Sequence, residues 1–260
     1  FVSLSQQNLT KGRYLFMKNT ALKTAPINRS GLIDIWNAFM VENADFSNHD
    51  IPLCPTTATS IPSKLIGYDE AKSTHKKMLR THHKDYHINA FIHFYMDDNK
   101  FDGKRSSFWL YPHKALEIIE HYDGIIVPDP STYADFPDPL KRWNFYRMNA
   151  FGFWIASLGH EVISNVRWNT PDTWEYCFDG NPKNSMLCIG TVASSLQYKV
   201  NYAPFAEGLF KMVEILTPHT ILVYGSSNYP CFDELRCRGI NIVTFKSSTC
   251  EYYEGRKPNE

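Results

Sequence analysis

Short apolar runs alternate with longer amphipathic runs over most of the chain from residue 64 onward. The short runs are rich in β-branched and aromatic residues, which is typical of strands, and the longer runs repeat apolar residues at helical spacing. The pattern predicts strands at Lys64–Tyr68, Ile88–Asp97, Gly124–Asp129, Glu161–Trp168, Met186–Val192, Thr220–Tyr224 and Asn241–Phe245, with a further short strand near Ile51–Cys54. It predicts helices at Pro112–His121, Pro137–Leu158, Pro204–Leu216 and Cys231–Arg238.

Proline and glycine mark the expected ends of these helices. Pro112, Pro137 and Pro204 each stand where a helical run begins, and proline is tolerated in the first turn of a helix. Gly159 and Gly239 follow helical runs, as C-terminal capping glycines do. The positions of proline and glycine therefore agree with the helices predicted from the spacing of apolar residues.

Strands that alternate with helices predict a parallel sheet with right-handed crossovers. The fold class expected is α/β, with a barrel-like, mainly parallel sheet of seven or eight strands. An open doubly wound sheet is the alternative, but the glycine-rich turn that usually follows an early strand of that fold is absent. The expected organisation is a polar N-terminal arm over residues 1–45, one α/β domain over 46–250 and a polar tail over 251–260.

In both the barrel and the open doubly wound sheet, ligands bind at the carboxyl ends of the strands. Alternation along the strand that begins at Ile88 places His93, Tyr95 and Asp97 on the inward face, and Asp98 then begins the loop. In the run at 162–169 the same rule places Arg167 inward. The inward position means that Arg167 is expected to be largely buried. Burying an unpaired charge costs a prohibitive amount of free energy, so Arg167 is also expected to pair with Asp97 or Asp129.

These strand ends supply the candidate chemistry. Asp97, Asp129 and Arg167 are candidate catalytic residues, with Arg167 as an anion clamp, and Asp97, Asp98 and Asp129 are candidate ligands for Mg²⁺ or Mn²⁺. A structural network of buried ions is the alternative interpretation, and core packing is the alternative for the aromatic residues. The remaining candidate ligand contacts are Ser131, Trp168, Asn169, Tyr224, Gly225 and Ser226.

The amino-acid composition excludes fewer classes of function than the residues at the strand ends suggest. Lys+Arg and Asp+Glu both number 27, so net charge gives no argument for nucleic acid or a membrane surface, and no apolar run approaches the roughly 20 residues of a membrane span. The six cysteines form no CxxC pair, which argues against zinc and for reduced, structural thiols. No motif for nicotinamide or flavin is present. The basic stretch at 73–84 predicts a solvated helix and loop, or alternatively a phosphate-binding patch.

Six sequence blocks resemble one family in order and spacing. They are FIHFYMDDNKF, IIVPDPSTYADFP, VISNVRWN, CFDGNPKNSMLCIGTV, FAEGLFKMVEILTP and ILVYGSSN. Between about Ile51 and Phe245 the chain is similar to the bacterial and phage family known as domain of unknown function 4417. The resemblance implies a protein of a phage or mobile element in the cytoplasm of a bacterial host. It implies no activity or cofactor, and the chain departs from the family at Pro130, where an aromatic residue is more usual.

Three functions follow as hypotheses. The first is a protein that binds a phosphorylated or nucleic-acid ligand at the strand ends, extending to metal-assisted hydrolysis of a phosphodiester or nucleotide. The second is a non-catalytic accessory module that binds a host or phage protein. The third is a carbohydrate hydrolase with paired carboxylates.

Overall fold

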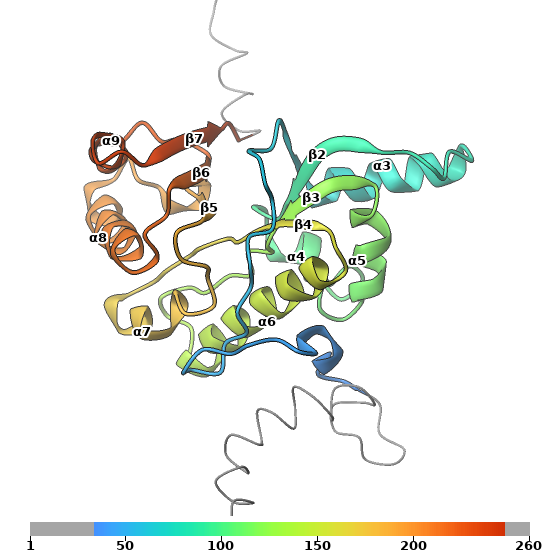
Figure 1. Cartoon of the computed structure of the whole chain (residues 1–260), viewed down its shortest axis with the longest axis horizontal. Coiled ribbons are helices and arrows are strands. Elements are labelled where there is room, and N and C mark those ends of the chain that lie inside the picture. Colours follow the sequence, from blue (N-terminus) through green and yellow to red (C-terminus); the bar gives the residue numbers. More distant parts are fainter. Residues whose placement is uncertain (1–33, 248–260) are drawn as a thin grey trace, which may run out of the picture.

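Helices and parallel strands alternate along residues 34–247, the part of the chain that the computed structural model describes (Figure 1). The strands are β1 (Leu65–Gly67), β2 (Ile88–His93), β3 (Tyr122–Ile126), β4 (Glu161–Ile163), β5 (Met186–Gly190), β6 (Thr220–Tyr224) and β7 (Asn241–Phe245). The α-helices are α3 (Tyr68–Arg80), α4 (Asp98–Phe101), α5 (Pro112–Ile119), α6 (Asp138–Ser157), α7 (Trp174–Cys177), α8 (Lys199–Leu216) and α9 (Pro230–Cys237). Short 3₁₀ turns lie at η2 (Ala38–Val41), η3 (Pro171–Thr173) and η4 (Val192–Ser194). The predicted α/β class with parallel pairing is confirmed.

The strands form two sheets instead of the single sheet of seven or eight strands that the sequence predicted. One sheet has the order β1-β2-β3-β4 and the other β5-β6-β7, and every neighbouring pair is parallel. Regular pairing of β4 ends at Ile163, so among the described residues the strand pairing between the two sheets is reduced to an isolated parallel bridge between Asn165 and Cys188. The short strand expected near residues 51–54 is absent from the described residues. An isolated antiparallel bridge between Phe46 and Pro52 lies there.

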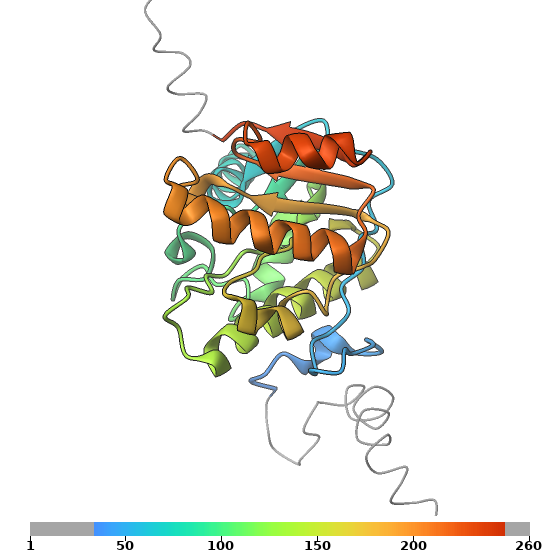
Figure 2. The ribbon, with the colours of Figure 1, turned by 90° about the vertical axis from the view of Figure 1, so that its left-hand side faces the viewer.

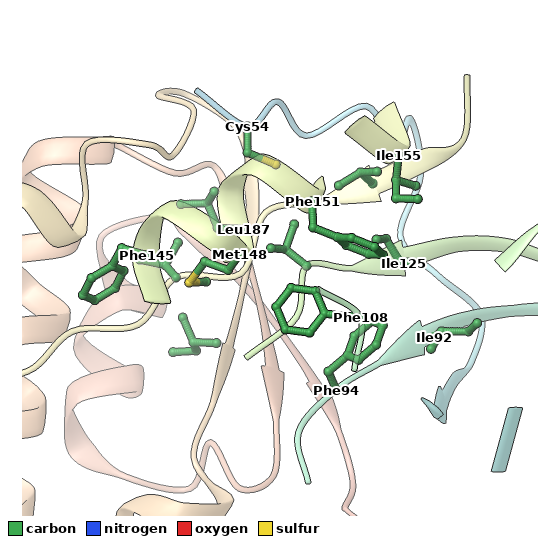
Figure 3. Packing of buried hydrophobic residues seen from close by; sticks show 14 of the residues in the cluster. Cys54, Ile92, Phe94, Phe108, Ile125, Phe145, Met148, Phe151, Ile155 and Leu187 are labelled. Atoms are coloured by element: carbon green, nitrogen blue, oxygen red, sulfur yellow. The ribbon is translucent and has the colours of Figure 1, made fainter. Parts of the chain in front are cut away.

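Helices cover the outer faces of both sheets. Figure 2 shows α8 and α9 lying across the β5-β6-β7 sheet, and α6 crosses the region between the sheets in Figure 1. Four large apolar residues of α6 recur every three or four positions and share one face, although the helix is also buried on its other sides. That face packs against β2, β3 and β5 in the main core (Figure 3), where the labelled side chains include Phe145, Met148, Phe151, Ile155, Ile92, Phe94, Ile125 and Leu187.

The opposite faces of the strands form a second apolar cluster. Every one of the seven described strands contributes a side chain to this cluster or packs a partly buried side chain against it. Its strand members are Leu65, Phe91, Ile126, Ile163, Met186, Cys188, Leu222, Val243 and Phe245. Side chains from both sheets therefore pack together in this cluster.

Element ends follow the sequence signals unevenly. Gly159 and Gly239 adopt positive φ of 91° and 85° after α6 and α9, which confirms their predicted capping role. Helix α8 instead begins at Lys199, and Pro204 lies inside it. Strand β2 ends at His93, four residues before the predicted end, because the Met96 N–H donates to the Phe94 carbonyl and turns the chain.

The expected arm and tail are described only in part. Residues 1–33 and 248–260, which include Cys250 and the whole expected tail, lie outside the described residues. Within the expected arm, η2 buries Ala38, Met40 and Val41 in the main core. None of the described helices is long and apolar enough to span a bilayer.

Candidate functional site

The carboxyl ends of β2, β3, β4 and β5 surround a cavity of about 390 Å³, called the mouth pocket below. This convergence is what parallel pairing imposes, because all these strands end at the same edge. The last lining residue, Phe205, comes from α8. The polar residues of the lining are Tyr95, Asp97, Asp98, Asp129, Ser131, Tyr133, Asn165, Arg167, Trp168 and Ser194.

A continuous chain of hydrogen bonds crosses the wall of the mouth pocket. The Tyr95 hydroxyl donates to Asn165 Oδ1 at 2.8 Å, and Asn165 Nδ2 donates to Asp129 Oδ1 at 3.0 Å. Arg167 Nη1 donates to the same Asp129 oxygen at 2.8 Å. Because Asn165 is 1% exposed and both its amide groups are engaged, the network fixes the carboxylate of Asp129 in place.

Burial keeps the hydroxyl and thiol groups of this wall protonated. The pKa of Tyr95 is raised well above its ordinary value, first by burial and then by the nearby Cys188 and Asp129. Burial also raises the pKa of the Cys188 thiol to about 12, although the Tyr95 hydroxyl, 3.2 Å from the sulfur, opposes the shift. Neither group is a nucleophile at neutral pH, so the wall offers hydrogen bonds and charge.

Arg167 pairs with Asp129, as predicted, and has no contact with Asp97. Its Nη1 also donates to the carbonyl oxygens of Asp129 at 3.2 Å and Pro130 at 3.0 Å, so the guanidinium holds the loop after β3. The side chains of Arg167 and Asp129 are 26% and 20% exposed, so Arg167 is largely buried, as expected, but not fully buried. The pair stands at the pocket edge, where solvent and a ligand both reach it.

The two adjacent aspartates have exchanged their expected roles. Asp98 accepts hydrogen bonds from the Ser131 backbone N–H at 3.2 Å and from Ser131 Oγ at 3.1 Å, which ties the start of α4 to the loop after β3. Burial raises the pKa of Asp98, with the two Ser131 hydrogen bonds and Arg167 acting against the shift. Asp97 is exposed at the N-cap of α4. The turn after Phe94 ends the strand alternation, so the inward face does not continue to Asp97.

A family model matches residues 44–246 and carries the description domain of unknown function (DUF4417). The match covers more than half of the chain and contains every residue that lines the mouth pocket. The chain belongs to this family. The resemblance predicted from the six sequence blocks is therefore confirmed.

Two phage proteins are among the relatives of the chain. It is 29% identical over 230 residues to the Gene 1 protein of Mycobacterium phage D29, covering 87% of this chain and 76% of that protein. It is 32% identical over 198 residues to the Gene 1 protein of Mycobacterium phage L5, covering 75% of this chain and 79% of that protein. No solved structure matches the chain. The comparisons thus connect this DUF4417 member with bacteriophages.

The three proposed metal ligands do not form a ready cluster. Among residues 34–247, no group of three His, Cys, Asp or Glu side chains is arranged to hold a metal ion. Asp129 is engaged by Arg167 and Asn165, and Asp98 by Ser131. Mg²⁺ often takes only one or two protein carboxylates and completes its shell with water and ligand phosphate. The metal site therefore stays a prediction that a ligand is required to test.

The predicted aromatic contact Trp168 does line the mouth pocket. Its ring lies 5.1 Å from that of Phe205 and 6.5 Å from that of Phe178, centroid to centroid. Gly208 of α8 permits this position, since a Cβ at Gly208 would stand 2.1 Å from Trp168 Cδ1. The glycine thus sets how closely the helix approaches the pocket wall.

Replacing Gly208 by Ala is expected to displace Trp168 and lower the free energy of unfolding by about 2 kcal/mol, in the range for overpacking. Glu207→Ala, at the exposed neighbouring position of the same helix, is the control and is expected to change stability by less than about 0.5 kcal/mol. Urea unfolding followed by tryptophan fluorescence measures both. Equal stability of the two variants would show that Trp168 moves freely and that Gly208 has no positioning role.

Four other predicted ligand contacts lie away from the mouth pocket. Asn169 donates to the Thr132 carbonyl and so braces the loop after β3. Gly225 turns the chain after β6 with φ of 119°, where a Cβ would meet Thr191 Oγ1 at 2.4 Å. The Ser226 carbonyl accepts a hydrogen bond from the same Thr191 hydroxyl at 3.0 Å. Tyr224 lines a second cavity instead.

That second cavity, of about 990 Å³, lies between β1 and β7 and contains a residue that the sequence did not single out. His93 lines it, is 5% exposed and packs against Tyr224 with ring centroids 4.1 Å apart and the ring planes tilted by 38°. The Tyr95 N–H donates to His93 Nδ1 at 3.2 Å, so a neutral ring carries its proton on Nε2. Burial lowers the pKa of His93 to about 4, against the opposing effect of Asp69. Strand alternation had placed His93 inward, and that was the available signal.

Proposed function

We propose that this chain is a phage or mobile-element protein that binds a small phosphorylated ligand of the nucleotide type in the mouth pocket. The observation that carries the proposal is the Arg167–Asp129 pair, 2.8 Å apart, at the edge of a cavity of about 390 Å³ whose wall includes Trp168. A guanidinium held by a carboxylate recognises phosphate oxygens, and an indole ring offers a face for a base or sugar.

The proposal includes a barrel-like closure of the two sheets. Its support is the sequential parallel order of the strands, the Asn165–Cys188 bridge between the sheets and the apolar cluster to which all seven described strands contribute. In barrels of this kind the loops at the carboxyl ends carry the ligand site. The mouth pocket occupies that position.

The charge of the lining indicates what else the ligand requires. Asp97, Asp98 and Asp129 face a single guanidinium in the mouth pocket. An anionic phosphate would be repelled by this excess of carboxylates unless a cation accompanied it. We therefore assign Mg²⁺ or Mn²⁺ to Asp97 and Asp98 at the start of α4, entering together with the phosphate. The ion would polarise a phosphoryl oxygen, which is the requirement for hydrolysis of a phosphodiester or nucleotide.

The metal assignment is tested by titrating Mg²⁺ and Mn²⁺ calorimetrically, with and without adenosine monophosphate. Wild type is expected to bind the ion more tightly when the nucleotide is present, and Asp97→Asn and Asp98→Asn are each expected to weaken binding at least tenfold. Asp135→Asn removes an exposed carboxylate outside the pocket lining and serves as control. Equal ion binding by all four proteins would remove Asp97 and Asp98 from the metal site.

The accessory-module function is the second candidate, and one observation favours it. Val192, Tyr198 and Val200, in and after the loop that follows β5, are 47%, 60% and 78% exposed. Apolar side chains that are left exposed within one short stretch of sequence favour a protein-binding surface there. If wild type binds no nucleotide with or without a divalent ion, this candidate replaces the first.

A further inference from the structure

Positive charge is concentrated in one short stretch of this neutral chain. Residues 72–87 contain five lysines or arginines, four histidines and a single acid, although the whole chain has 27 basic and 27 acidic residues. The stretch forms most of α3 and the connection to β2. In Figure 1 this part of the molecule extends beyond the rest of the fold at its right-hand edge.

Four cations of the stretch are exposed, and none has an ion-pair partner within residues 34–247; they are Lys76, Lys77, Arg80 and Lys84. Other cations of the protein have partners: Lys72 donates a hydrogen bond to Ser106 Oγ, and Arg142 forms ion pairs with Asp138 and Glu175. Cations in the last turn of a helix are favoured by the helix dipole, which accounts for Lys77 and Arg80. The helix dipole does not explain the presence of Lys76, which lies one turn before Arg80, or of Lys84, which lies beyond the end of the helix.

The backbone beneath these cations is held in place. Tyr86 stacks on His121 with centroids 4.0 Å apart, and its hydroxyl lies 2.9 Å from His75 Nδ1. His121 Nδ1 in turn lies 2.8 Å from the Tyr86 carbonyl oxygen. Through these contacts, the segment that connects α3 with β2 is held against α3 on one side and against the residues after α5 on the other. The four cations therefore project from a fixed base, which lowers the entropy lost when they bind.

We infer that Lys76, Lys77, Arg80 and Lys84, called the α3 basic surface, bind the phosphate backbone of a nucleic-acid duplex without reading its sequence. Exposed cations without ion-pair partners on a protruding element are the typical means by which proteins contact the phosphates of a duplex. Tyr86, the only Phe, Tyr or Trp in the connection, is already stacked on His121, so base stacking of a single strand on this ring is disfavoured. Leu79 is the one large apolar side chain exposed on α3, so the helix lacks the apolar face of membrane-surface helices.

The α3 basic surface shares no residue with the mouth pocket and does not rest on the nucleotide-binding proposal. The test is fluorescence anisotropy with a labelled 20-base-pair DNA duplex of arbitrary sequence, at several NaCl concentrations from 50 mM. The same measurement is made with an RNA duplex, a single strand and vesicles of anionic lipid. The test variant changes all four cations to Gln, which preserves helix propensity.

Wild type is expected to bind both duplexes with a logarithmic salt slope near −3 to −4, because each neutralised phosphate contributes about −0.9. The four-Gln variant should bind at least tenfold more weakly at 50 mM NaCl and lose most of that slope. Its thermal unfolding midpoint should fall by no more than a few degrees, because the replaced side chains have no ion-pair partner and only Lys77 and Arg80 interact with the helix dipole. A matched control changes four exposed lysines elsewhere, Lys104, Lys114, Lys183 and Lys199, to Gln and should retain duplex binding.

Three results would overturn the inference. The first is no duplex binding by wild type at 50 mM NaCl. The second is an equal loss in the test variant and the control, which would show diffuse charge attraction. The third is binding to anionic vesicles without binding to either duplex, which would assign the surface to a membrane.

Discussion

Replacing Arg147 by Leu is expected to lower the free energy of unfolding by about 3–5 kcal/mol. Arg147 Nη1 lies 2.6 Å from Asp102 Oδ2, and the two side chains are only 12% and 14% exposed. Asn144 Oδ1 accepts from Arg147 Nη2, and Ser107 Oγ donates to Asp102. Removal of the guanidinium leaves the Asp102 charge buried with one neutral partner, and that desolvation penalty dominates.

The matched comparison is Arg167→Leu. Its pair with Asp129 is more exposed, so solvent screens the stranded carboxylate and the expected loss is about 1–2 kcal/mol. Urea unfolding monitored by tryptophan fluorescence at neutral pH measures both variants. Equal losses, or a larger loss for Arg167, would contradict the conclusion that burial decides between the two pairs.

The second large effect is a loss of stability in acid that depends on His93. Its folded pKa of about 4 lies below the value of about 6.5 expected in the unfolded chain. The unfolded state therefore takes up the proton first, so this contribution to stability is complete above pH 6.5 and is lost as pH falls toward 4. The difference corresponds to at most about 3 kcal/mol at 1.36 kcal/mol per pKa unit.

The measurement is the free energy of unfolding of wild type and His93→Phe in urea at pH 7, 6 and 5. Carboxylates titrate in both proteins, so the difference between the two curves isolates His93. Wild type is expected to lose about 2 kcal/mol more than the variant between pH 7 and pH 5. Parallel curves would mean that His93 titrates near its ordinary value and is not buried as described.

The strands were predictable where alternation continued to the strand end. In the run after β4, alternation correctly placed Asn165 and Arg167 inward, toward Asp129. In the run after β2 the same rule failed, because a backbone turn from Met96 to Phe94 precedes the two aspartates. A sequence pattern carries no signal for such a turn when neither glycine nor proline marks it.

The helix ends, too, were predicted correctly only where the sequence marks them. Helix α6 begins and ends within one residue of its predicted bounds because Pro137 and Gly159 mark its two ends. The first turn of α8 was missed because its residues are exposed, with Val200 at 78%, and so show no apolar period. The Arg147–Asp102 pair was missed for another reason: it joins a helix to a loop 45 residues away, and only the tertiary fold brings them together.

Calorimetric titration of adenosine monophosphate, with Mg²⁺ present, into wild type and Arg167→Gln tests the mouth pocket as a phosphate site most directly. Arg142→Gln, which removes a guanidinium outside the pocket lining, is the control. Wild type and the control are expected to bind the nucleotide with equal affinity, and Arg167→Gln at least tenfold more weakly. Binding that is equal in all three proteins, or absent from wild type, would contradict the assignment of Arg167 as the phosphate clamp.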